Sequence, residues 1–325
     1  MSDNKILKIK DLVVEVITSS GIIQPVRHLD LDVGKKEIVG IVGESGSGKS
    51  MTIKSIMRLH NERKVSIDGS IVYDGKELLA LKEKEMLQYR GNEMAMIFQD
   101  PMISLNPIKT VGKQVVEMIL ENESISKEKA KKRVLDVFKK VQINPPEQRF
   151  NQYPFELSGG MLQRIVIAMS LVCHAKLLLA DEPTTALDVS TQAQILKMIK
   201  EMQNQEDMSV IVVTHNFGVV AEICEKVAVM YAGRIVESGN VREIFDNPMH
   251  PYTKALMQSR ISPSMRGKKI TTIPGVPPSL HGKMQGCPFA PRCKKATENC
   301  FVIQPELVDI DGHKVACRIL GGEKR

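Results

Sequence analysis

Residues 37–50 read Glu-Ile-Val-Gly-Ile-Val-Gly-Glu-Ser-Gly-Ser-Gly-Lys-Ser, and this stretch decides the fold. Its first six residues form a short apolar run rich in β-branched side chains, which predicts a buried strand. The pattern Gly-x-x-x-x-Gly-Lys-Ser follows at once, and residues 51–59 continue with helical periodicity. A glycine-rich loop between a strand and a helix is typical of a phosphate-binding loop, because its backbone N–H groups can surround a phosphate at the helix N-terminus.

The loop is therefore predicted to bind the phosphates of a nucleotide. Lys49 is expected to reach the β- and γ-phosphates, and the Ser50 hydroxyl is expected to bind Mg²⁺. The predicted nucleotide-binding residues are Gly43, Glu44, Ser45, Gly46, Ser47, Gly48, Lys49, Ser50 and Met51.

Two acidic residues follow a second apolar run, residues 177–180. Asp181 is expected at the edge of the sheet beside Mg²⁺, which leaves Glu182 to polarise the attacking water. Adjacent carboxylates can divide these roles because the metal lowers the pKa of one more than that of the other.

Strand and helix patterns alternate along the chain. Residues 210–213 form a third apolar strand candidate, and residues 189–202 before it have a helical apolar face. This alternation predicts an α/β fold with a mostly parallel sheet and helices on its faces. Residues 126–143 are strongly helical, so roughly residues 100–160 are predicted to be a helical insertion. The basic run at 127–133 is interpreted as a solvated helix face.

A further motif, Leu-Ser-Gly-Gly at 157–160, precedes Asp181 by just over twenty residues. With it the chain resembles the nucleotide-binding subunits of ATP-binding-cassette (ABC) transporters. Four more elements of that family follow in order, namely Gln99 in Ile-Phe-Gln-Asp-Pro, the turn Ala186-Leu187-Asp188, His215 after Val-Ile-Val-Val-Thr, and a turn at Gly233–Gly239. The resemblance covers residues 5–260. It implies an ABC-type P-loop NTPase core with an N-terminal antiparallel β subdomain.

In this family two cassettes pair head to tail and trap two ATP molecules. The resemblance implies that Ser158, Gly159 and Gly160 donate hydrogen bonds to the γ-phosphate bound to the opposite subunit. Asp188 would connect the two sites. The residues implied to be catalytic are Glu182, His215, which would contact the γ-phosphate, and Gln99, which would touch Mg²⁺ or the water. The Mg²⁺ ligands would be Ser50, Gln99 and Asp181.

Two positions depart from the family pattern. Family members stack adenine on an aromatic residue before the phosphate loop, whereas this chain has no Phe, Tyr or Trp before Tyr73. Val16 or Ile17 falls near the expected place, so the base must be held in another way. Met161 follows the Leu-Ser-Gly-Gly motif where many cassettes carry Gln; the contacts of Ser158 and the glycines are expected to be unaffected.

Within the family, the resemblance is to ATP-binding subunits of oligopeptide, dipeptide and nickel importers. It is carried by residues 100–107 (Asp-Pro-Met-Ile-Ser-Leu-Asn-Pro), 247–256 (Asn-Pro-Met-His-Pro-Tyr-Thr-Lys-Ala-Leu), 273–278 and 286–293. The implied function is ATP hydrolysis that powers import of dipeptides or oligopeptides, with a nickel or metal-chelate importer as the alternative. The implied partners are two permease subunits, a second ATPase subunit (a paralogue or a second copy) and, indirectly, an extracytoplasmic solute-binding protein. The implied location is the cytoplasmic face of the cell membrane, and no nucleic acid is involved.

The chain changes character after residue 260, so residues 1–260 are predicted to form the ATPase domain and residues 261–325 a small C-terminal module. Seven of the 16 prolines and four of the six cysteines lie there, and residues 260–325 carry the whole net charge of +7. Such a basic tail is typical either of an ordinary surface or of a surface facing nucleic acid or an anionic membrane. Cys173 and Cys224 are predicted to be core residues.

The spacing Cys287-x5-Cys293-x6-Cys300-x16-Cys317 is compatible with zinc, with an iron–sulfur cluster or with free or oxidised thiols. Zinc sites usually use closer pairs, and the resemblance implies a [4Fe–4S] cluster on these four residues.

The composition excludes several classes. With 42% apolar and 26% charged residues, the chain can build a full core and is not disordered. It has no candidate membrane span or secretory signal, so we expect a cytoplasmic protein with reduced thiols. A soluble cassette protein of translation or DNA repair usually fuses two cassettes or inserts coiled coils, and exporters often fuse membrane spans. A role in binding alone would require loss of Lys49 or Glu182. The sequence favours an importer ATPase over all three.

Overall fold

The computed structural model describes residues 4–185, 187–259, 272–282 and 284–319. These residues divide into two units that we describe separately. The helical unit contains the segments up to Ile6, Val33–Ile38 and Ala80–Val213, and the phosphate-loop unit contains Leu7–Asp32, Val39–Leu79 and the chain from Thr214 onward. The predicted boundary at residue 260 lies outside the described residues, as does Ala186. The division at residue 260 therefore stays a prediction.

Three parallel strands form the sheet of the helical unit, in the order β8-β7-β6. They are β6 (Met94–Ile97), β7 (Leu177–Asp181) and β8 (Ser209–Thr214). Leu177 lies opposite both Met94 on one side and Ser209 on the other. Every residue of β7 and β8 is buried, which is why both read as continuous apolar runs rather than as alternating patterns. The strands predicted at residues 177–180 and 210–213 are therefore confirmed.

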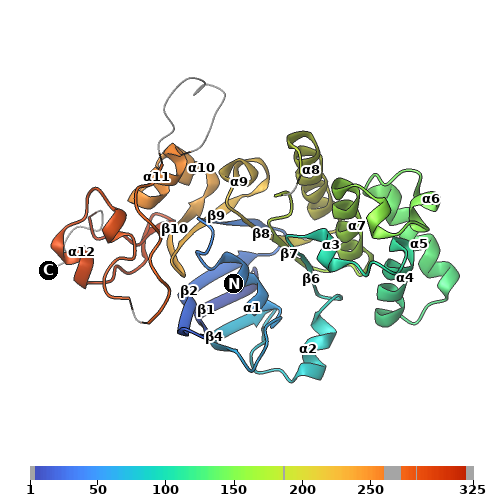
Figure 1. Cartoon of the computed structure of the whole chain (residues 1–325), viewed down its shortest axis with the longest axis horizontal. Helices are drawn as coiled ribbons and strands as arrows, with labels where there is room; N and C mark the ends of the chain where they lie inside the picture. Colours follow the sequence, from blue (N-terminus) through green and yellow to red (C-terminus); the bar gives the residue numbers. More distant parts are fainter. Residues whose placement is uncertain (1–3, 186, 260–271, 283, 320–325) are drawn as a thin grey trace. The chain divides into compact units, whose positions relative to one another are not determined.

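Helices make up the rest of this unit (Figure 1). They are α2 (Glu83–Tyr89), α3 (Pro101–Ser104), α4 (Val111–Asn122), α5 (Lys127–Lys140), α6 (Pro146–Phe150), the 3₁₀ turn η1 (Pro154–Glu156), α7 (Gly159–Val172) and α8 (Val189–Gln205). Helix α5 begins after Ser126, whose hydroxyl accepts the Lys129 N–H at 3.3 Å. It buries Ala130, Val134 and Phe138 on one side, as its periodicity predicts. Among the described helices, none combines the length and hydropathy that a bilayer span requires.

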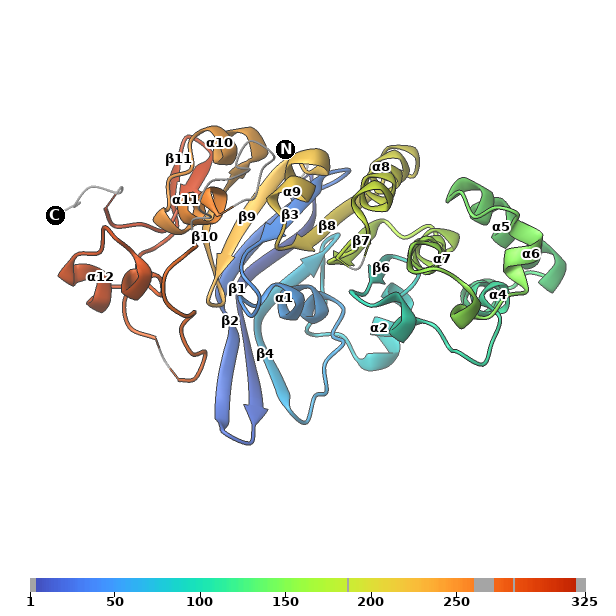
Figure 2. The same cartoon turned by 45° about the horizontal axis from the view of Figure 1, so that its top comes forward.

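An antiparallel sheet of order β2-β1-β4-β5 lies in the phosphate-loop unit (Figure 2). Its strands are β1 (Lys5–Thr18), β2 (Gly21–Gly34), β4 (Val65–Tyr73) and β5 (Lys76–Glu77). The register of β1 and β4 pairs Leu7 with Tyr73 and Val16 with Val65. The expected N-terminal antiparallel β subdomain is therefore confirmed.

A second group of strands in the same unit has the order β11-β12-β10-β9-β3. The strands are β3 (Ile38–Val42), β9 (Lys226–Tyr231), β10 (Arg234–Asn240), β11 (Val308–Ile310) and β12 (His313–Val315). The helices are α1 (Lys49–Ile56), α9 (Phe217–Ile223), α10 (Val241–Asp246), α11 (Pro251–Gln258), the 3₁₀ turn η3 (Ala290–Arg292) and α12 (Glu298–Val302).

The prediction of a turn over residues 233–239 was wrong. The chain turns only at Ala232 and Gly233, both at positive φ, and then runs as β10. Strand β10 pairs antiparallel with β9, and its Ile235 and Val236 are buried. Burial of these two side chains against β9 outweighs the turn tendency of the glycines at both ends.

The described C-terminal residues share the core of the phosphate-loop unit. Strand β12 pairs with β10, with Val315 opposite Glu237. Phe289 packs against Tyr231 and Tyr252, with ring centroids 5.3 and 5.4 Å apart. The fully buried Glu237 carboxylate accepts the backbone N–H groups of Met249 and His250 and pairs with the His313 ring at 2.7 Å. These contacts join the C-terminal residues to the sheet.

Candidate active site

The predicted phosphate loop leads from β3 into α1, as the mechanism demands. Gly48 is the N-cap of α1 and provides no side chain to satisfy the first helical N–H groups. Those donors, together with the helix dipole, favour an anion at this end of the helix. The loop is closed by two backbone hydrogen bonds, from Ser47 N–H to Glu44 O at 3.2 Å and from Gly233 N–H to Ser47 O at 2.9 Å.

Two of the loop glycines are required by close backbone approach. A Cβ on Gly43 would lie 2.1 Å from the Met230 carbonyl oxygen, and one on Gly48 would lie 2.0 Å from the Pro25 carbonyl oxygen. Gly48 also has a φ of +105°, which side-chain-bearing residues rarely adopt. The loop can therefore keep this path only with glycine at both positions.

The Lys49 ammonium lies inside the loop and not in solvent. Its side chain is buried, and Nζ donates to the carbonyl oxygens of Gly43 and Glu44, both at 2.9 Å. The Ser47 hydroxyl is also buried and has no hydrogen-bond partner among the described residues. A buried hydroxyl without a partner costs free energy, and a phosphate oxygen would relieve that cost. The loop residues therefore fit a polyphosphate ligand.

In the helical unit, the structure brings Gln99 and Glu182 together. Gln99 follows β6 and donates from Nε2 to Glu182 Oε2 at 3.2 Å. The Thr185 hydroxyl donates to the same oxygen at 2.7 Å. Glu182 directly follows the buried Asp181 at the end of β7. Two donors on one oxygen orient the carboxylate.

The backbone at Glu182 is strained. Its φ is +47°, the left-handed region that a side-chain-bearing residue occupies at a cost of about 1 kcal/mol or more. The Glu182 N–H donates to the Val213 carbonyl at 2.9 Å, which holds the strained residue against the neighbouring strand. Strain at an acidic residue after a buried strand is typical of a functional position.

The Ser-Gly-Gly motif begins the 14-residue helix α7, as expected. The Ser158 hydroxyl is the N-cap and accepts the Met161 N–H at 3.4 Å. Ser158 and Gly159 are exposed, and a Cβ added to Gly159 would meet no atom within 4 Å. The first N–H groups of α7 are therefore accessible to an anion from outside this unit.

Asp188 is the N-cap of α8. Its Oδ1 accepts the Ser190 hydroxyl at 2.6 Å and the backbone N–H groups of Ser190 and Thr191 at 3.1 and 3.0 Å. The Ser190 hydroxyl, followed by these backbone donors, lowers the pKa of Asp188 well below its usual range. The exposed Asp188 is therefore a fixed anion at this turn.

The phosphate-loop unit places His215 and the candidate adenine contacts on its surface. His215 follows β8 and is exposed, and the next residue, Asn216, caps α9 by accepting the Gly218 N–H at 2.8 Å. Ile17 on β1 and Ile22 on β2 are 59% and 51% exposed. The sequence pointed to Val16 or Ile17, of which Val16 is half-buried and Ile17 exposed.

The four C-terminal cysteines line one cavity of about 20 Å³ together with His250 and Phe289. All four are free thiols, and burial raises the pKa of Cys287 to about 11, with the neighbouring Cys317 and Cys300 adding to the effect. Nowhere in the described ranges do three His, Cys, Asp or Glu side chains converge on a position for a single metal ion. The number of donors fits a four-thiolate group, but the cavity has room for only about one water molecule. The thiols would therefore have to move apart around a larger ligand.

Cys173 and Cys224 lie apart from this cavity; Cys173 is buried, as predicted for a core residue, whereas Cys224 is only half-buried. They follow the ends of α7 and α9, and the Cys224 sulfur packs below Gly40, where an added Cβ would approach it to 3.1 Å.

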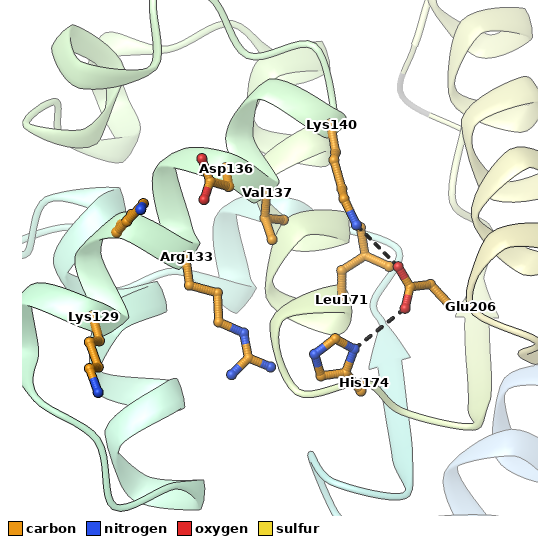
Figure 3. A pocket seen from close by; sticks show the side chains of 9 residues that line it. Lys129, Arg133, Asp136, Val137, Lys140, Leu171, His174 and Glu206 are labelled. Carbon is orange, nitrogen blue, oxygen red and sulfur yellow. Dashed lines mark hydrogen bonds and ion pairs between the residues drawn. The ribbon is translucent and has the colours of Figure 1, made fainter.

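A pocket of about 360 Å³ lies among α5 and the ends of α7 and α8 (Figure 3). Lys129 and Lys132 line it and are exposed, as predicted for a solvated helix face, whereas Arg133 is half-buried. On one side of the pocket, the Glu206 carboxylate lies 3.2 Å from Lys140 Nζ through Oε1 and 3.4 Å from His174 Nδ1 through Oε2 (Figure 3). None of the predicted nucleotide-binding residues lines this pocket.

Sequence reasoning missed three residues that contact the predicted site. Thr185 donates a hydrogen bond to the Glu182 carboxylate. The Tyr252 hydroxyl accepts the Glu44 N–H, and Arg292 donates to the Glu44 carboxylate. The last two lie in stretches that carried the family resemblance, but no local pattern assigned them a role.

A phosphate loop with this geometry, an acidic pair after a buried strand and an accessible Ser-Gly-Gly helix start define an ABC-type ATPase. Residues 26–185 match the family "ABC transporter", and residues 236–300 match "Oligopeptide/dipeptide transporter, C-terminal region". The chain belongs to the family of ATP-binding subunits of oligopeptide and dipeptide ABC transporters.

Two relatives from Bacillus subtilis (strain 168) are each 47% identical to this chain. One is the dipeptide transport ATP-binding protein DppD, aligned over 96% of this chain and 94% of its own length. The other is the oligopeptide transport ATP-binding protein OppD, aligned over 97% and 89%. A solved dimeric structure of the ATP-binding cassette MJ0796 bound to ADP and Pi has a TM-score of 0.66 at 28% identity and covers 73% of this chain and 99% of that chain.

Proposed function

We propose that this chain hydrolyses ATP to energise the import of dipeptides or oligopeptides through a pair of permease subunits at the cytoplasmic face of the membrane. The phosphate loop binds the β- and γ-phosphates through Lys49 and the N–H groups of residues 43–51. Ser50, Gln99 and Asp181 hold Mg²⁺. Glu182 polarises the attacking water, and His215 contacts the γ-phosphate.

The geometry around Glu182 is the single observation that carries this assignment. Its Oε2 is already occupied by Gln99 and Thr185, so the carboxylate is oriented before any substrate arrives. A general base needs such orientation, because rate falls steeply when the accepting oxygen is displaced. Gln99 also lies just before α3, so a change at the Mg²⁺ or water that it contacts would reach that helix.

We propose that Ser158, Gly159 and Gly160 bind the γ-phosphate of a second cassette, and that Asp188 connects the two sites. The accessible start of α7 supports this role, since its first N–H groups have no cap beyond Ser158. The MJ0796 structure is described as dimeric, which supports pairing of two cassettes. The second cassette is a paralogue or another copy of this chain.

The surface for the permease is proposed to lie on the helical unit beside Gln99. Ile103 and Ile108 are 83% and 80% exposed, and Phe155 is 68% exposed and stacked on Tyr153. The Val111 N–H donates to the Gln152 carbonyl at 2.9 Å, which brings the end of one exposed segment beside the start of the other. Apolar side chains exposed in neighbouring segments are typical of a protein–protein interface.

The four thiols at one cavity support the proposal that Cys287, Cys293, Cys300 and Cys317 hold a [4Fe–4S] cluster. Four thiolates are the ligand set of such a cluster, in which each thiolate binds a different iron. The gaps of five, six and sixteen residues between these cysteines are wider than those of the usual zinc sites, which disfavours zinc.

Iron and sulfide analysis of anaerobically purified protein tests this proposal. Cys317→Ser should lower the iron content, whereas Cys173→Ser, which changes a buried cysteine outside the cavity, should not. Stoichiometric zinc, or full iron content in Cys317→Ser, would contradict the assignment.

Transport by the reconstituted complex tests the function itself. Labelled dipeptides, longer peptides and nickel chelates are offered in parallel, and uptake is measured with wild-type chain and with Glu182→Gln. We expect ATP-dependent peptide uptake that the variant abolishes. Uptake of the nickel chelate alone would establish the alternative substrate class.

A further inference from the structure

Arg292 and Glu44 form a two-point ion pair within the phosphate-loop unit. Arg292 Nη1 lies 2.7 Å from Glu44 Oε2, and Nη2 lies 3.0 Å from Oε1. The Arg292 side chain is only 5% exposed, and that of Glu44 is 25% exposed. Bidentate, charge-assisted pairs fix orientation as well as charge. A residue from the C-terminal region therefore holds the second residue of the phosphate loop.

The guanidinium is itself held in place before it meets Glu44. Its Nε donates to the Pro274 carbonyl at 2.8 Å, and Nη1 also donates to the Tyr231 hydroxyl at 3.2 Å. Arg292 ends the short turn η3 and lies beside Cys293. With its rotamer fixed by these contacts, Arg292 loses little entropy in binding Glu44.

The backbone of Glu44 is held as well. The hydroxyl of Tyr252 accepts the Glu44 N–H at 2.9 Å. Tyr252 is fully buried, and its ring lies 4.4 Å from that of Tyr231 between centroids. Side chain and main chain of this one loop residue are thus both anchored by residues from the C-terminal half of the unit, whereas the next two residues, Ser45 and Gly46, are exposed.

We propose that Arg292 is a positioning residue for ATP binding, acting through Glu44. It fixes the path of the loop at its second residue, and it neutralises a carboxylate beside the site of a highly anionic polyphosphate. Without Arg292, the Glu44 carboxylate would repel the ligand that the loop binds. The C-terminal region therefore contributes to nucleotide affinity while contacting no nucleotide.

Because Arg292 neutralises Glu44 in this proposal, loss of Arg292 should weaken ATP binding more than loss of the Glu44 charge. Arg292→Met in the assembled transporter should raise the KM for ATP about tenfold and leave kcat within about twofold, because a charge-assisted contact is worth more than about 1.4 kcal/mol, or one factor of ten. Glu44→Gln keeps an acceptor and removes the repelling charge, so its KM should rise about threefold or less. The double variant should bind ATP better than Arg292→Met alone. A fluorescent ATP analogue bound to the purified chain gives the same comparison as dissociation constants.

Arg27→Met is the matched control. Arg27 is equally buried, and its Nη2 donates to the carbonyls of Leu280 and Gly282 at 2.9 and 3.0 Å, so it anchors the same C-terminal segment without touching Glu44. Its KM should stay at the wild-type value even if the melting temperature falls. An equal rise in KM for Arg27→Met would overturn the proposal, because general loosening would then explain the effect. A double variant no better than Arg292→Met would overturn it too.

If Arg292→Met does not fold, two milder variants test the same proposal. Arg292→Lys keeps the charge but offers a single point of contact, and Tyr252→Phe keeps the ring but removes the acceptor for the Glu44 N–H. Each should raise the KM for ATP about threefold with kcat unchanged. An unchanged KM in both would refute the positioning role.

Discussion

Replacing Gly48 by alanine should destabilise the phosphate-loop unit far more than replacing Gly46. Both glycines have positive φ, +105° and +77°, so each alanine pays a backbone cost of about 1–2 kcal/mol. Only at Gly48 would the new Cβ meet other atoms, at 2.0 Å from the Pro25 carbonyl oxygen and 2.7 Å from Met230 Cε. Relieving such a contact requires a backbone shift worth about 1–3 kcal/mol more. Gly48→Ala should therefore cost about 2–5 kcal/mol in total, and Gly46→Ala about 1–2 kcal/mol.

Thermal unfolding of the full chain without nucleotide measures this difference. At about 2–4 °C for each kcal/mol, the extra cost of about 1–3 kcal/mol should make Gly48→Ala melt about 2–12 °C below Gly46→Ala. Urea unfolding at 25 °C provides an independent free energy. Equal losses in the two variants would refute the reasoning, because the close approach to Pro25 distinguishes the two positions.

Three further outcomes are expected. Glu182→Gln should bind ATP normally, stabilise the closed dimer and abolish turnover; steady-state ATPase activity of the complex at the wild-type rate would contradict its role. Thr185→Val removes one donor from Glu182 and should lower kcat about tenfold at unchanged ATP affinity, whereas Thr185→Ser should retain most of the activity. Burial lowers the pKa of His60 below 6.5, so the unfolded chain takes up a proton that the folded chain resists, and the unfolding free energy should fall as pH drops below about 6.5. Urea titrations should show a weaker pH dependence in His60→Gln, and an unchanged slope would contradict this assignment.

The sequence predicted the strands and the loop because each carries a local signal. Strand β3 is a continuous apolar run, and the loop that follows carries the pattern Gly-x-x-x-x-Gly-Lys-Ser within eight consecutive residues. The caps Ser158 and Asp188 are also local, since each bonds to N–H groups two or three residues away. Such features can be recognised before any tertiary structure is known.

Features that depend on tertiary contacts could not be predicted. Arg292 and Glu44 are 248 positions apart, and nothing near either residue specifies the other. Glu237 is a charged residue in a strand and would be expected at the surface, yet it is completely buried and has partners from two distant segments, residues 249–250 and His313. The family resemblance implied a turn over residues 233–239, whereas pairing with β9 makes residues 234–239 part of a strand.

Gly159 distinguishes what this chain needs in order to fold from what it needs in order to work. The surrounding protein leaves open space where its side chain would be, and its backbone is ordinary helix. A stability screen of the isolated polypeptide would therefore score a bulky replacement there as harmless or even favourable. With Gly159 in its proposed place at the γ-phosphate of a second cassette, the same replacement should fail in a growth assay that requires nutrient uptake, and the disagreement between the two screens would locate the proposed contact.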